Sequence, residues 1–440
     1  MNDPFTFTYH NLAIDKETLV DRAAQLAGYA TRLRERLHAK RGYEMPEDSV
    51  LLPSDDAHAA LAREAAARLW SKQLKYVVLI GIGGSNLGAQ AVLAGLRRAC
   101  VIPETEQPTI LFADTVDQRG VEEVADLIEA QVHHADEALF ILVSKSGTTT
   151  ESIVNAEILI APFAKRFVSQ WKSRVVCISD AGSLLSKRAD TLGLSALPIP
   201  KPVGGRYSVF SSVGIFPLAL AGVDVDAFRK GGAEMARRCT LEAPEENPAM
   251  RGAIVLAEAL RRGCTVHNLF LFDPSLEMLG KWYRQLLAES IGKERDRQGN
   301  VMHIGITPII SIGSTDLHSM AQLYFGGPQD KFTTLVTTAP TTSRKVPADG
   351  IFHGLVSGIE GKSPAEIMRA IAGGTEAAYQ SLRLPYAHVD LGKAGAYDIG
   401  AFMQWKMLET MYLAELLNVN AFDQPSVEAY KKETRTRLGD

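Results

Sequence analysis

The chain has 440 residues, 46% of them hydrophobic and 22% charged, which is enough apolar material for two or three packing units. A formal net charge of −4 without a basic stripe indicates no nucleic-acid partner. No signal-peptide pattern opens the chain, so we expect a cytoplasmic protein. Four cysteines form no CxxC pair, which argues against structural zinc and predicts reduced, buried thiols; they are Cys100, Cys177, Cys239 and Cys264.

Strands and helices alternate in the first half of the chain. Residues 1–56 are predicted to be mainly helix with loop. From residue 57 on, the order predicts a parallel sheet covered on both faces. Residues 76–96 carry no charge over 21 positions, but their GIGGSN segment favours strand, turn and helix over a membrane span. The expected strands are 76–82, 109–113, 138–143 and 174–179, and the expected helices are 88–99, 121–130 and a stretch ending near residue 167.

The second half repeats this organisation after a Pro- and Gly-rich segment at 197–206, LPIPKPVGGR, which is predicted to be a linker. The predicted fold is α/β, with two doubly wound lobes of mostly parallel sheets. The lobes are placed at 57–200 and 201–418, with an N-terminal helical segment at 1–56 and a C-terminal helical tail at 419–440. In the second lobe and tail, helices are expected at 213–221, 249–262, 276–291, 399–417 and from Pro425, and strands at 266–272, 333–336 and 387–389.

A glycine-rich turn, GIGGSNLG at 81–88, joins the first buried strand to a helix. Such turns bind phosphate because glycines let the backbone approach and the helix N-terminus offers free N–H groups. The dinucleotide-binding pattern G-x-G-x-x-G requires a third glycine at position 86, where this chain has Asn86. Its ribose-binding acidic residue is expected about 20 residues later, and Asp114 lies further along the chain than that. Both departures argue against a dinucleotide site. The P-loop pattern is absent. A tight turn without a ligand is the alternative.

A second turn, SKSGTTTES at 144–152, follows the strand at 138–143, and six of its nine residues carry hydroxyls. Hydroxyls and helix N-terminal amides together suit a phosphate dianion. Thr148 and Glu151 also fit a capping box, so helix capping is an alternative for these two residues. Two such turns after neighbouring parallel strands predict one small phosphate ester at the carboxyl edge of the sheet.

Both turns resemble the phosphate-binding turns of sugar isomerase (SIS) domains. Three further segments resemble signature regions of the glucose-6-phosphate isomerase family: GGRYSVFSSVG at 204–214, QLLAESIGK at 285–293 and FDQPSVEAYK at 422–431. All five occur in the family's order. Ser426 departs from the pattern, because the family usually has glycine before the Val-Glu of the last segment. The resemblance implies reversible isomerisation of glucose 6-phosphate to fructose 6-phosphate through a cis-enediol(ate), without a metal or another cofactor.

Glu289 is the candidate base for this proton transfer. It follows Gln285 by four residues, so both side chains lie on one helical face among apolar neighbours. A carboxyl group that acts as an acid or base near neutral pH needs a pKa raised by burial. A solvated surface glutamate is the alternative from the residues alone. The resemblance implies that Glu289 transfers the proton and that Gln285 hydrogen-bonds the substrate.

The remaining roles are implied by the resemblance alone. Arg206 would stabilise the enediolate, with a surface arginine or a phosphate clamp as the alternative. His318 would open the sugar ring from the partner subunit, which implies a homodimer. Lys431 would share in ring opening and Gln424 would contact the substrate. The implied phosphate ligands are Gly84, Ser85, Ser144, Lys145, Ser146, Thr148 and Thr149, with Gly84 and Lys145 contributing backbone groups.

Two other functions stay open. An isomerase that also accepts mannose 6-phosphate would share this chemistry and differ only in its handling of carbon 2. A non-catalytic SIS-type sensor of sugar phosphates would need the two phosphate turns but none of the four proposed catalytic residues, all of which are present. A small-molecule sugar phosphate is the expected partner in each case, and neither a membrane nor a nucleic acid is expected.

Overall fold

The computed structural model describes residues 5–38, 42–96, 107–339 and 344–439. These form two compact units: unit 1 holds Met1–Arg34 and Glu234–Asp440, and unit 2 holds Glu35–Ala233. The predicted lobe boundaries differ from these, because residues 201–233 belong to unit 2 and the start of the chain belongs to unit 1. Cys100 lies outside the described residues; the other three cysteines are free and buried.

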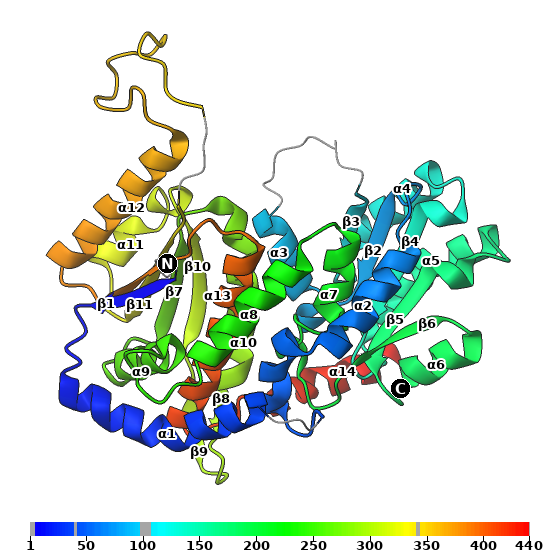
Figure 1. The fold of residues 1–440 in the computed structure, drawn as a ribbon, viewed down its shortest axis with the longest axis horizontal. Coiled ribbons are helices and arrows are strands. Elements are labelled where there is room, and N and C mark those ends of the chain that lie inside the picture. Colours follow the sequence, from blue (N-terminus) through cyan, green and yellow to red (C-terminus); the bar gives the residue numbers. More distant parts are fainter. Residues whose placement is uncertain (1–4, 39–41, 97–106, 340–343, 440) are drawn as a thin grey trace. The chain divides into compact units, whose positions relative to one another are not determined.

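Unit 2 is built on a five-stranded sheet whose neighbouring strands all run parallel (Figure 1). The apolar runs of the strands β2, β4 and β5 are almost entirely buried, which is typical of a parallel sheet covered on both faces. Four of the five strands are predicted by the sequence. The strand order is β3 (Thr109–Ala113), β2 (Tyr76–Ile80), β4 (Ala138–Val143), β5 (Val175–Asp180) and β6 (Ser195–Ile199).

The predicted linker at 197–206 is wrong in its first residues, which belong to β6 and pair with β5. Pro198 removes a backbone donor, but an edge strand tolerates proline because one of its sides has no strand partner. The rest of the segment leads into the short 3-10 helix η5 (Gly205–Tyr207). Arg206 in this helix is buried, so the alternative of a surface arginine is wrong.

Helices cover both faces of the unit 2 sheet. α4, α5 and α6 pack on one face through residues such as Ile128, Phe163 and Ala189. α7 contacts both α2 and α3, and adjacent strand residues such as Val77 and Val78, which point to opposite faces, are both fully buried. The helices are α2 (Asp56–Leu69), α3 (Leu87–Leu96), α4 (Gln118–Gln131), α5 (Thr150–Arg166), α6 (Leu184–Leu192) and α7 (Ser212–Leu220), with 3-10 turns η1 (Pro46–Ser54), η3 (Ala135–Glu137) and η4 (Trp171–Arg174).

Unit 1 contains a second five-stranded sheet that is parallel except for one edge strand. That strand is β1 (Thr6–His10), which pairs antiparallel with β12 and was not part of the prediction of mainly helix with loop at 1–56. A separate antiparallel pair is formed by β8 (Lys293–Arg295) and β9 (Val301–Ile304). The remaining strand order is β12 (Tyr386–Asp390), β11 (Lys331–Thr337), β7 (Val266–Leu271) and β10 (Thr307–Ile312).

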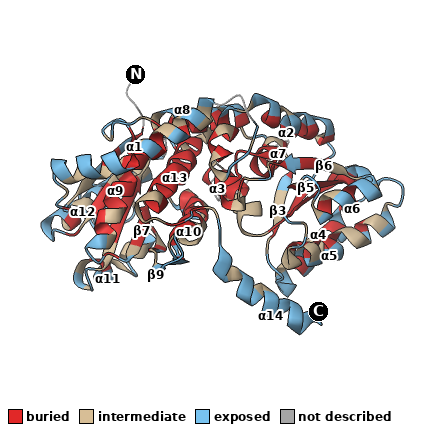
Figure 2. Cartoon of the chain, turned by 90° about the horizontal axis from the view of Figure 1, so that it is seen from below, coloured by how far each residue is buried: buried red, intermediate tan, exposed pale blue. Residues whose placement is uncertain are grey.

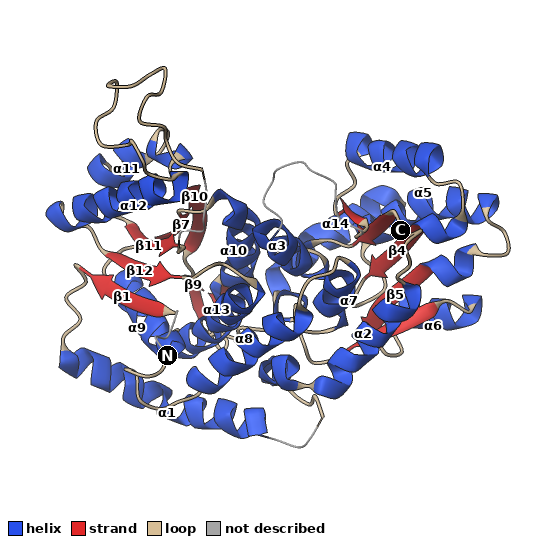
Figure 3. Ribbon diagram, turned by 45° about the horizontal axis from the view of Figure 1, so that its top comes forward, coloured by secondary structure: helices blue, strands red, loops and turns tan. Residues whose placement is uncertain are grey.

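Helices also lie on both sides of the unit 1 sheet (Figure 3). α11 and α12 pack on one face through Tyr324, Ala372 and Tyr379, and α13 packs against α9 and α10. The predicted class, α/β with mostly parallel sheets and helical segments near both chain ends, is confirmed. The helices are α9 (Pro248–Arg261), α10 (Glu277–Ile291), α11 (Ala321–Gly326), α12 (Pro364–Ser381), α13 (Ala396–Leu416) and α14 (Glu428–Leu438), with 3-10 turn η6 (Pro274–Leu276). Two further helices, α1 (Lys16–His38) and α8 (Val225–Arg238), continue along the chain across the unit boundaries after Arg34 and Ala233.

The core of unit 1 contains a buried ion pair on α13. Lys406 Nζ donates to Glu409 Oε1 over 2.7 Å and also lies 3.8 Å from the ring centroid of Trp405. Burial lowers the pKa of Lys406 and raises the pKa of Glu409, and the attraction between the two charges opposes both shifts. The Lys406 ammonium also lies 4.9 Å from the ring centroid of Tyr283 on α10. This cation–π contact packs the buried ion pair of α13 against α10.

α14 differs from the other long helices, because none of its residues is buried (Figure 2). Within the described ranges, no helix combines the length and the apolar character that crossing a membrane requires.

Candidate active site

The two predicted phosphate turns leave the same edge of the unit 2 sheet. β2 and β4 are parallel neighbours with Ile80 opposite Leu142, so the turns that follow them emerge side by side. The glycine turn continues into the 3-10 helix η2 (Gly83–Ser85) and then α3, and Gly83 has a left-handed φ of 59°. This placement agrees with a ligand at the carboxyl edge of the sheet.

Hydroxyl groups order the second turn. Ser144 Oγ lies 2.9 Å from Thr149 Oγ1 and accepts the N–H of Gly147, while Ser146 Oγ lies 3.1 Å from Thr148 Oγ1. The predicted capping box is wrong: Thr149 occupies the N-cap of α5, and its side chain makes no capping hydrogen bond. Thr148 is exposed and lies outside the N-cap position, so helix capping does not explain its hydroxyl.

Gly84 brings the first phosphate turn directly against the segment that carries Arg206. A Cβ built on Gly84 would lie 2.2 Å from the carbonyl carbon of Gly205 and 2.6 Å from the nitrogen of Arg206. The close approach of these two backbones therefore requires glycine. Ser208 Oγ reinforces the turn by donating to the carbonyl of Gly205 over 2.7 Å.

A pair of cations borders these turns. Burial lowers the pKa of Lys145, a shift that the nearby Asp180 carboxylate opposes and the Arg206 charge increases. Burial also raises the pKa of Asp180, against the attraction of Lys145. The side chains of Lys145 and Arg206 are therefore close enough to interact electrostatically, which gives the turns a positive environment suited to a phosphate dianion. The family resemblance implied only a backbone role for Lys145.

In unit 1, α10 presents the candidate base and its neighbour together. Gln285 Nε2 donates to Glu289 Oε1 over 3.0 Å, which agrees with the prediction that the two residues share one helical face. Gln285 Oε1 is buried without a hydrogen-bond partner in the described part of the chain. Since a buried carbonyl without a partner is costly, this oxygen is available to a ligand donor.

Lys293 was not among the site residues predicted from the sequence. Its buried ammonium donates to the carbonyl of Glu289 over 2.7 Å and to the carbonyl of Asp423 over 2.5 Å, and it pairs with the Asp423 carboxylate at 3.1 Å. Lys293 therefore ties the end of α10 to the last signature segment. A lysine just beyond a helix C-terminus commonly binds its last carbonyls, and that signal was present in the sequence. A cavity of about 550 Å³ lies beside Lys293 and Asp423.

The last signature segment begins α14 through a short 3-10 turn, η8 (Pro425–Val427). Gln424 stands at its N-cap and Pro425 at its first position, so the helical segment expected from Pro425 begins there. Gln424 is exposed. The Lys431 ammonium pairs with the Glu428 carboxylate at 2.7 Å on the surface.

His318 follows the 3-10 turn η7 (Thr315–Leu317) and is exposed. This turn leaves the carboxyl end of β10, which is parallel to β7, with Ile312 opposite Leu271. His318 therefore lies at the carboxyl edge of the unit 1 sheet.

Glu289 lies at the opposite edge of the same sheet. α10 starts at the carboxyl edge after β7 and runs back, and at 1.5 Å per residue Glu289 is about 18 Å from its first residue, Glu277. The helix ends against Gly305, just before β10 begins, where a Cβ on Gly305 would lie 3.1 Å from Gly292 Cα. The Glu289 and His318 of one chain are thus separated by the length of the sheet.

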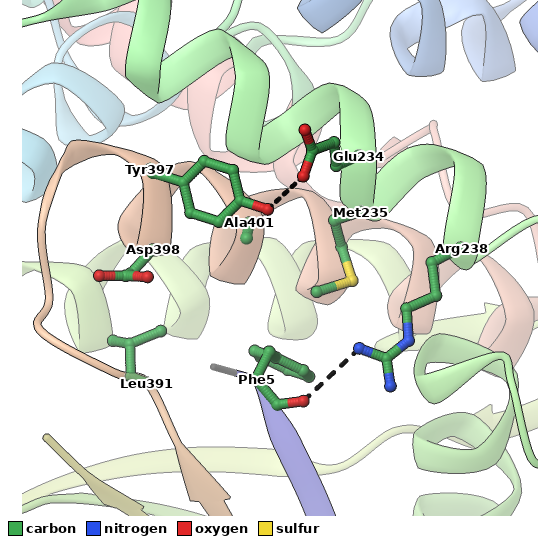
Figure 4. Close-up of a pocket in the computed structure, with 8 residues that line it drawn as sticks. All are labelled: Phe5, Glu234, Met235, Arg238, Leu391, Tyr397, Asp398 and Ala401. Carbon is green, nitrogen blue, oxygen red and sulfur yellow. Dashed lines mark hydrogen bonds between the residues drawn. The ribbon is translucent and has the colours of Figure 1, made fainter. Parts of the chain in front are cut away.

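A smaller cavity of about 230 Å³ lies elsewhere in unit 1, between α8, α13 and β1 (Figure 4). Its polar side chains bind protein groups: Tyr397 donates to the carboxylate of Glu234, and Arg238 donates to the carbonyl of Phe5. It contains none of the predicted site residues. In the described ranges, no group of three or more His, Cys, Asp or Glu side chains is arranged to hold a metal ion.

These features define an α/β protein with two adjacent glycine- and hydroxyl-rich turns at one sheet edge and a hydrogen-bonded glutamate–glutamine pair on a helix. A family model described as phosphoglucose isomerase matches residues 65–436, a range that contains every predicted site residue. The chain belongs to the phosphoglucose isomerase family.

Individual relatives agree with this assignment. A glucose-6-phosphate isomerase of Rubrobacter xylanophilus is 33% identical over 445 residues, which cover 99% of this chain and 98% of the relative. The crystal structure of a hypothetical protein from Thermus thermophilus superposes with a TM-score of 0.86 at 30% identity and covers 99% of this chain and 100% of its own. A glucose-6-phosphate isomerase structure from Chlamydia trachomatis has a TM-score of 0.79 at 19% identity, covers 99% of this chain and 88% of its own, and supports the fold alone.

Proposed function

We propose that this chain is an aldose–ketose isomerase that interconverts glucose 6-phosphate and fructose 6-phosphate. The observation that carries the proposal is the family match over residues 65–436, which includes both phosphate turns and all the candidate acid–base residues. The adjacent turns of unit 2 and the Gln285–Glu289 pair of unit 1 each support the proposal.

The phosphate is assigned to unit 2. The main-chain and side-chain groups proposed to bind it come from the two adjacent turns, and Lys145 and Arg206 supply positive charge beside them. Hydroxyls and N–H groups hold a phosphate dianion without needing a change in protonation. The proposed ligands are Gly84, Ser85, Ser144, Lys145, Ser146, Thr148 and Thr149.

The proton transfer is assigned to Glu289. Its carboxylate would take the proton from carbon 2 of the open-chain aldose, giving a cis-enediol(ate), and return it to carbon 1 to form the ketose. Gln285 orients the carboxylate through its hydrogen bond and offers its free carbonyl oxygen to a substrate hydroxyl. Arg206 is proposed to stabilise the negative charge that develops on oxygen in the enediolate.

Ring opening is assigned to His318 and Lys431, with Gln424 contacting substrate. His318 stands at the opposite sheet edge from Glu289, so one hexose phosphate cannot reach both residues of the same chain. We therefore propose a homodimer in which each chain supplies His318 to the other chain's site.

A coupled assay on purified protein tests the function, with glucose 6-phosphate and mannose 6-phosphate run in parallel. We expect rapid turnover of glucose 6-phosphate that is unchanged by EDTA. Comparable turnover of mannose 6-phosphate would identify a dual isomerase. Tight binding of sugar phosphates without turnover would contradict the proposal and identify a sensor.

We also propose a cytoplasmic location. The buried free thiols of Cys177, Cys239 and Cys264 support it, since proteins of oxidising compartments commonly pair their cysteines. Cell fractionation with antibodies to the chain tests this, and recovery from a secreted or periplasmic fraction would contradict it.

A further inference from the structure

A third turn of unit 2 stands beside the second phosphate turn. β5 ends at Asp180, and residues 181–183 lead from it into α6. β5 runs parallel to β4, with Ile178 opposite Val143, so the third turn leaves the same edge of the sheet as the turn at 144–152 (Figure 1). This brings a carboxylate to the edge where a phosphate dianion is proposed to bind. Since two anions repel each other, the presence of Asp180 there needs a reason.

Backbone contacts fix the third turn against the second phosphate turn. The N–H of Asp180 donates to the carbonyl of Lys145 over 3.3 Å, and the N–H of Ser183 closes the third turn by donating to the carbonyl of Asp180 over 3.1 Å. A Cβ built on Gly147 would lie 2.4 Å from the backbone nitrogen of Leu185, so the start of α6 packs directly on the phosphate turn. Asp180 therefore has a fixed position relative to Lys145.

The Asp180 carboxylate is directed at cations. Its Oδ1 atom is buried without a hydrogen-bond partner in the part of the chain that the structure describes. Burial raises the pKa of Asp180, and the charges of Lys145 and, to a smaller extent, Lys201 oppose that shift. Because no protein donor neutralises this oxygen, its charge acts at full strength on the cations beside it.

Lys145 needs such a charge. Burial lowers the pKa of its ammonium, the Arg206 charge lowers it further, and the Asp180 carboxylate opposes both effects. A lysine has a flexible four-carbon stem, so repulsion by Arg206 alone would turn the ammonium away from the phosphate turn. Within the described ranges, Lys145 forms no direct ion pair, so Asp180 attracts the ammonium without occupying it.

We propose that Asp180 is a positioning residue that holds the Lys145 ammonium beside the second phosphate turn, ready for the phosphate of the substrate. The inference rests on the phosphate site of the proposed function. The attraction between Asp180 and Lys145 offsets the repulsion between Lys145 and Arg206, so two cations can face one dianion. If Asp180 only diluted the positive charge of the site, its removal would strengthen phosphate binding, which is the opposite sign.

The first experiment measures the binding of inorganic phosphate, and separately of glucose 6-phosphate, to the full chain by titration calorimetry. D180N is expected to raise the dissociation constant of both ligands at least fivefold, and D180E, which keeps the charge, should recover most of the affinity. D190N changes an exposed aspartate on α6 and should leave both constants within twofold of wild type. Far-UV circular dichroism confirms folding, and D180S replaces D180N if that variant does not fold.

The second experiment is a double-mutant cycle with K145M. K145M alone should weaken the binding of both ligands about tenfold, and D180N/K145M should bind no more weakly than K145M, because Asp180 acts only through the ammonium. A purely structural role of Asp180 would instead give losses that add. In steady-state kinetics, D180N should raise KM while kcat stays within twofold of wild type.

The outcomes separate this proposal from the proposed function. Unchanged or tighter phosphate binding in D180N, additive losses in the cycle, or a lower kcat with unchanged KM would each overturn the positioning role. Non-additive losses of inorganic phosphate binding in a chain that does not turn over glucose 6-phosphate would keep the positioning role and refute the proposed function alone. A wild type that binds neither ligand would overturn both.

Discussion

The two units share a five-stranded α/β plan but arrange their proposed functional residues differently. In unit 2, the phosphate turns leave adjacent strands at one sheet edge, and the Arg206 turn packs directly against Gly84. In unit 1, Glu289 and His318 lie at opposite edges of the sheet. The proposed binding groups thus come from neighbouring turns of one sheet, whereas the candidate acid–base groups Glu289 and His318 do not meet within one chain.

The largest effect is expected from E289Q in unit 1. Removing the proton acceptor should lower kcat by about 10²- to 10⁴-fold while leaving phosphate-ester binding nearly intact, because the phosphate is assigned to unit 2. Steady-state kinetics and calorimetric binding of the substrate check this. E277Q changes an exposed glutamate on the same helix and should be close to wild type. Near-normal turnover in E289Q would rule out its role as the base.

A large loss of stability is expected from K406M. Removing one partner of the buried ion pair leaves Glu409 buried and unpaired, which should lower the free energy of unfolding by about 3–5 kcal/mol. Urea denaturation measures it, and the double variant K406M/E409L should recover much of the loss. The exposed pair on α14 provides the contrast: K431M should change stability by only about 0–1 kcal/mol. Equal losses in both variants would show that burial of the pair is unimportant.

A smaller effect on catalysis is expected from K293M. Without the ammonium that joins the carbonyls of Glu289 and Asp423, the base should be held less accurately, and kcat should fall by about 10- to 100-fold with little change in KM. K293R should restore part of the activity if Lys293 acts by positioning. K281M removes an exposed lysine of the same region as a control. A change in unfolding free energy with unchanged kcat would assign Lys293 a structural role only.

The smallest effect is expected from T148V in unit 2. Loss of one hydroxyl hydrogen bond to a charged phosphate, typically worth about 1.5–3 kcal/mol, should raise KM roughly tenfold or more while kcat stays near wild type. Since Thr148 does not cap α5, unfolding free energy should change by less than about 0.5 kcal/mol. A stability loss with normal KM would favour helix capping after all.

Much of the fold was predictable from sequence because its signals are local. The buried runs of β2 and β4 and the turns after them are contiguous stretches whose apolar content, glycines and hydroxyls indicate strand, turn and helix. β1, β6 and β10 were missed for a physical reason: all three are edge strands, and short or Pro-containing edge segments lack the apolar runs of central strands.

The candidate site was predictable only in part. Gln285 and Glu289 are four residues apart on one helix, so their contact follows from helix geometry. The contact of Lys293 with Asp423 joins positions 130 residues apart, and no local pattern indicates such a pairing. Gly84 was recognised as part of a phosphate turn, but its close approach to Gly205 was not.

The sequence by itself determined the class of fold, the two glycine- and hydroxyl-rich turns proposed to bind phosphate and the helical face shared by Gln285 and Glu289, because turn chemistry and side-chain periodicity act over a few neighbouring residues. Only the tertiary structure decided which turns share a sheet edge, which distant backbones touch, and that Glu289 and His318 stand at opposite edges. Those outcomes depend on strand order and helix direction, which arise from packing of the whole unit and are not encoded in any single segment.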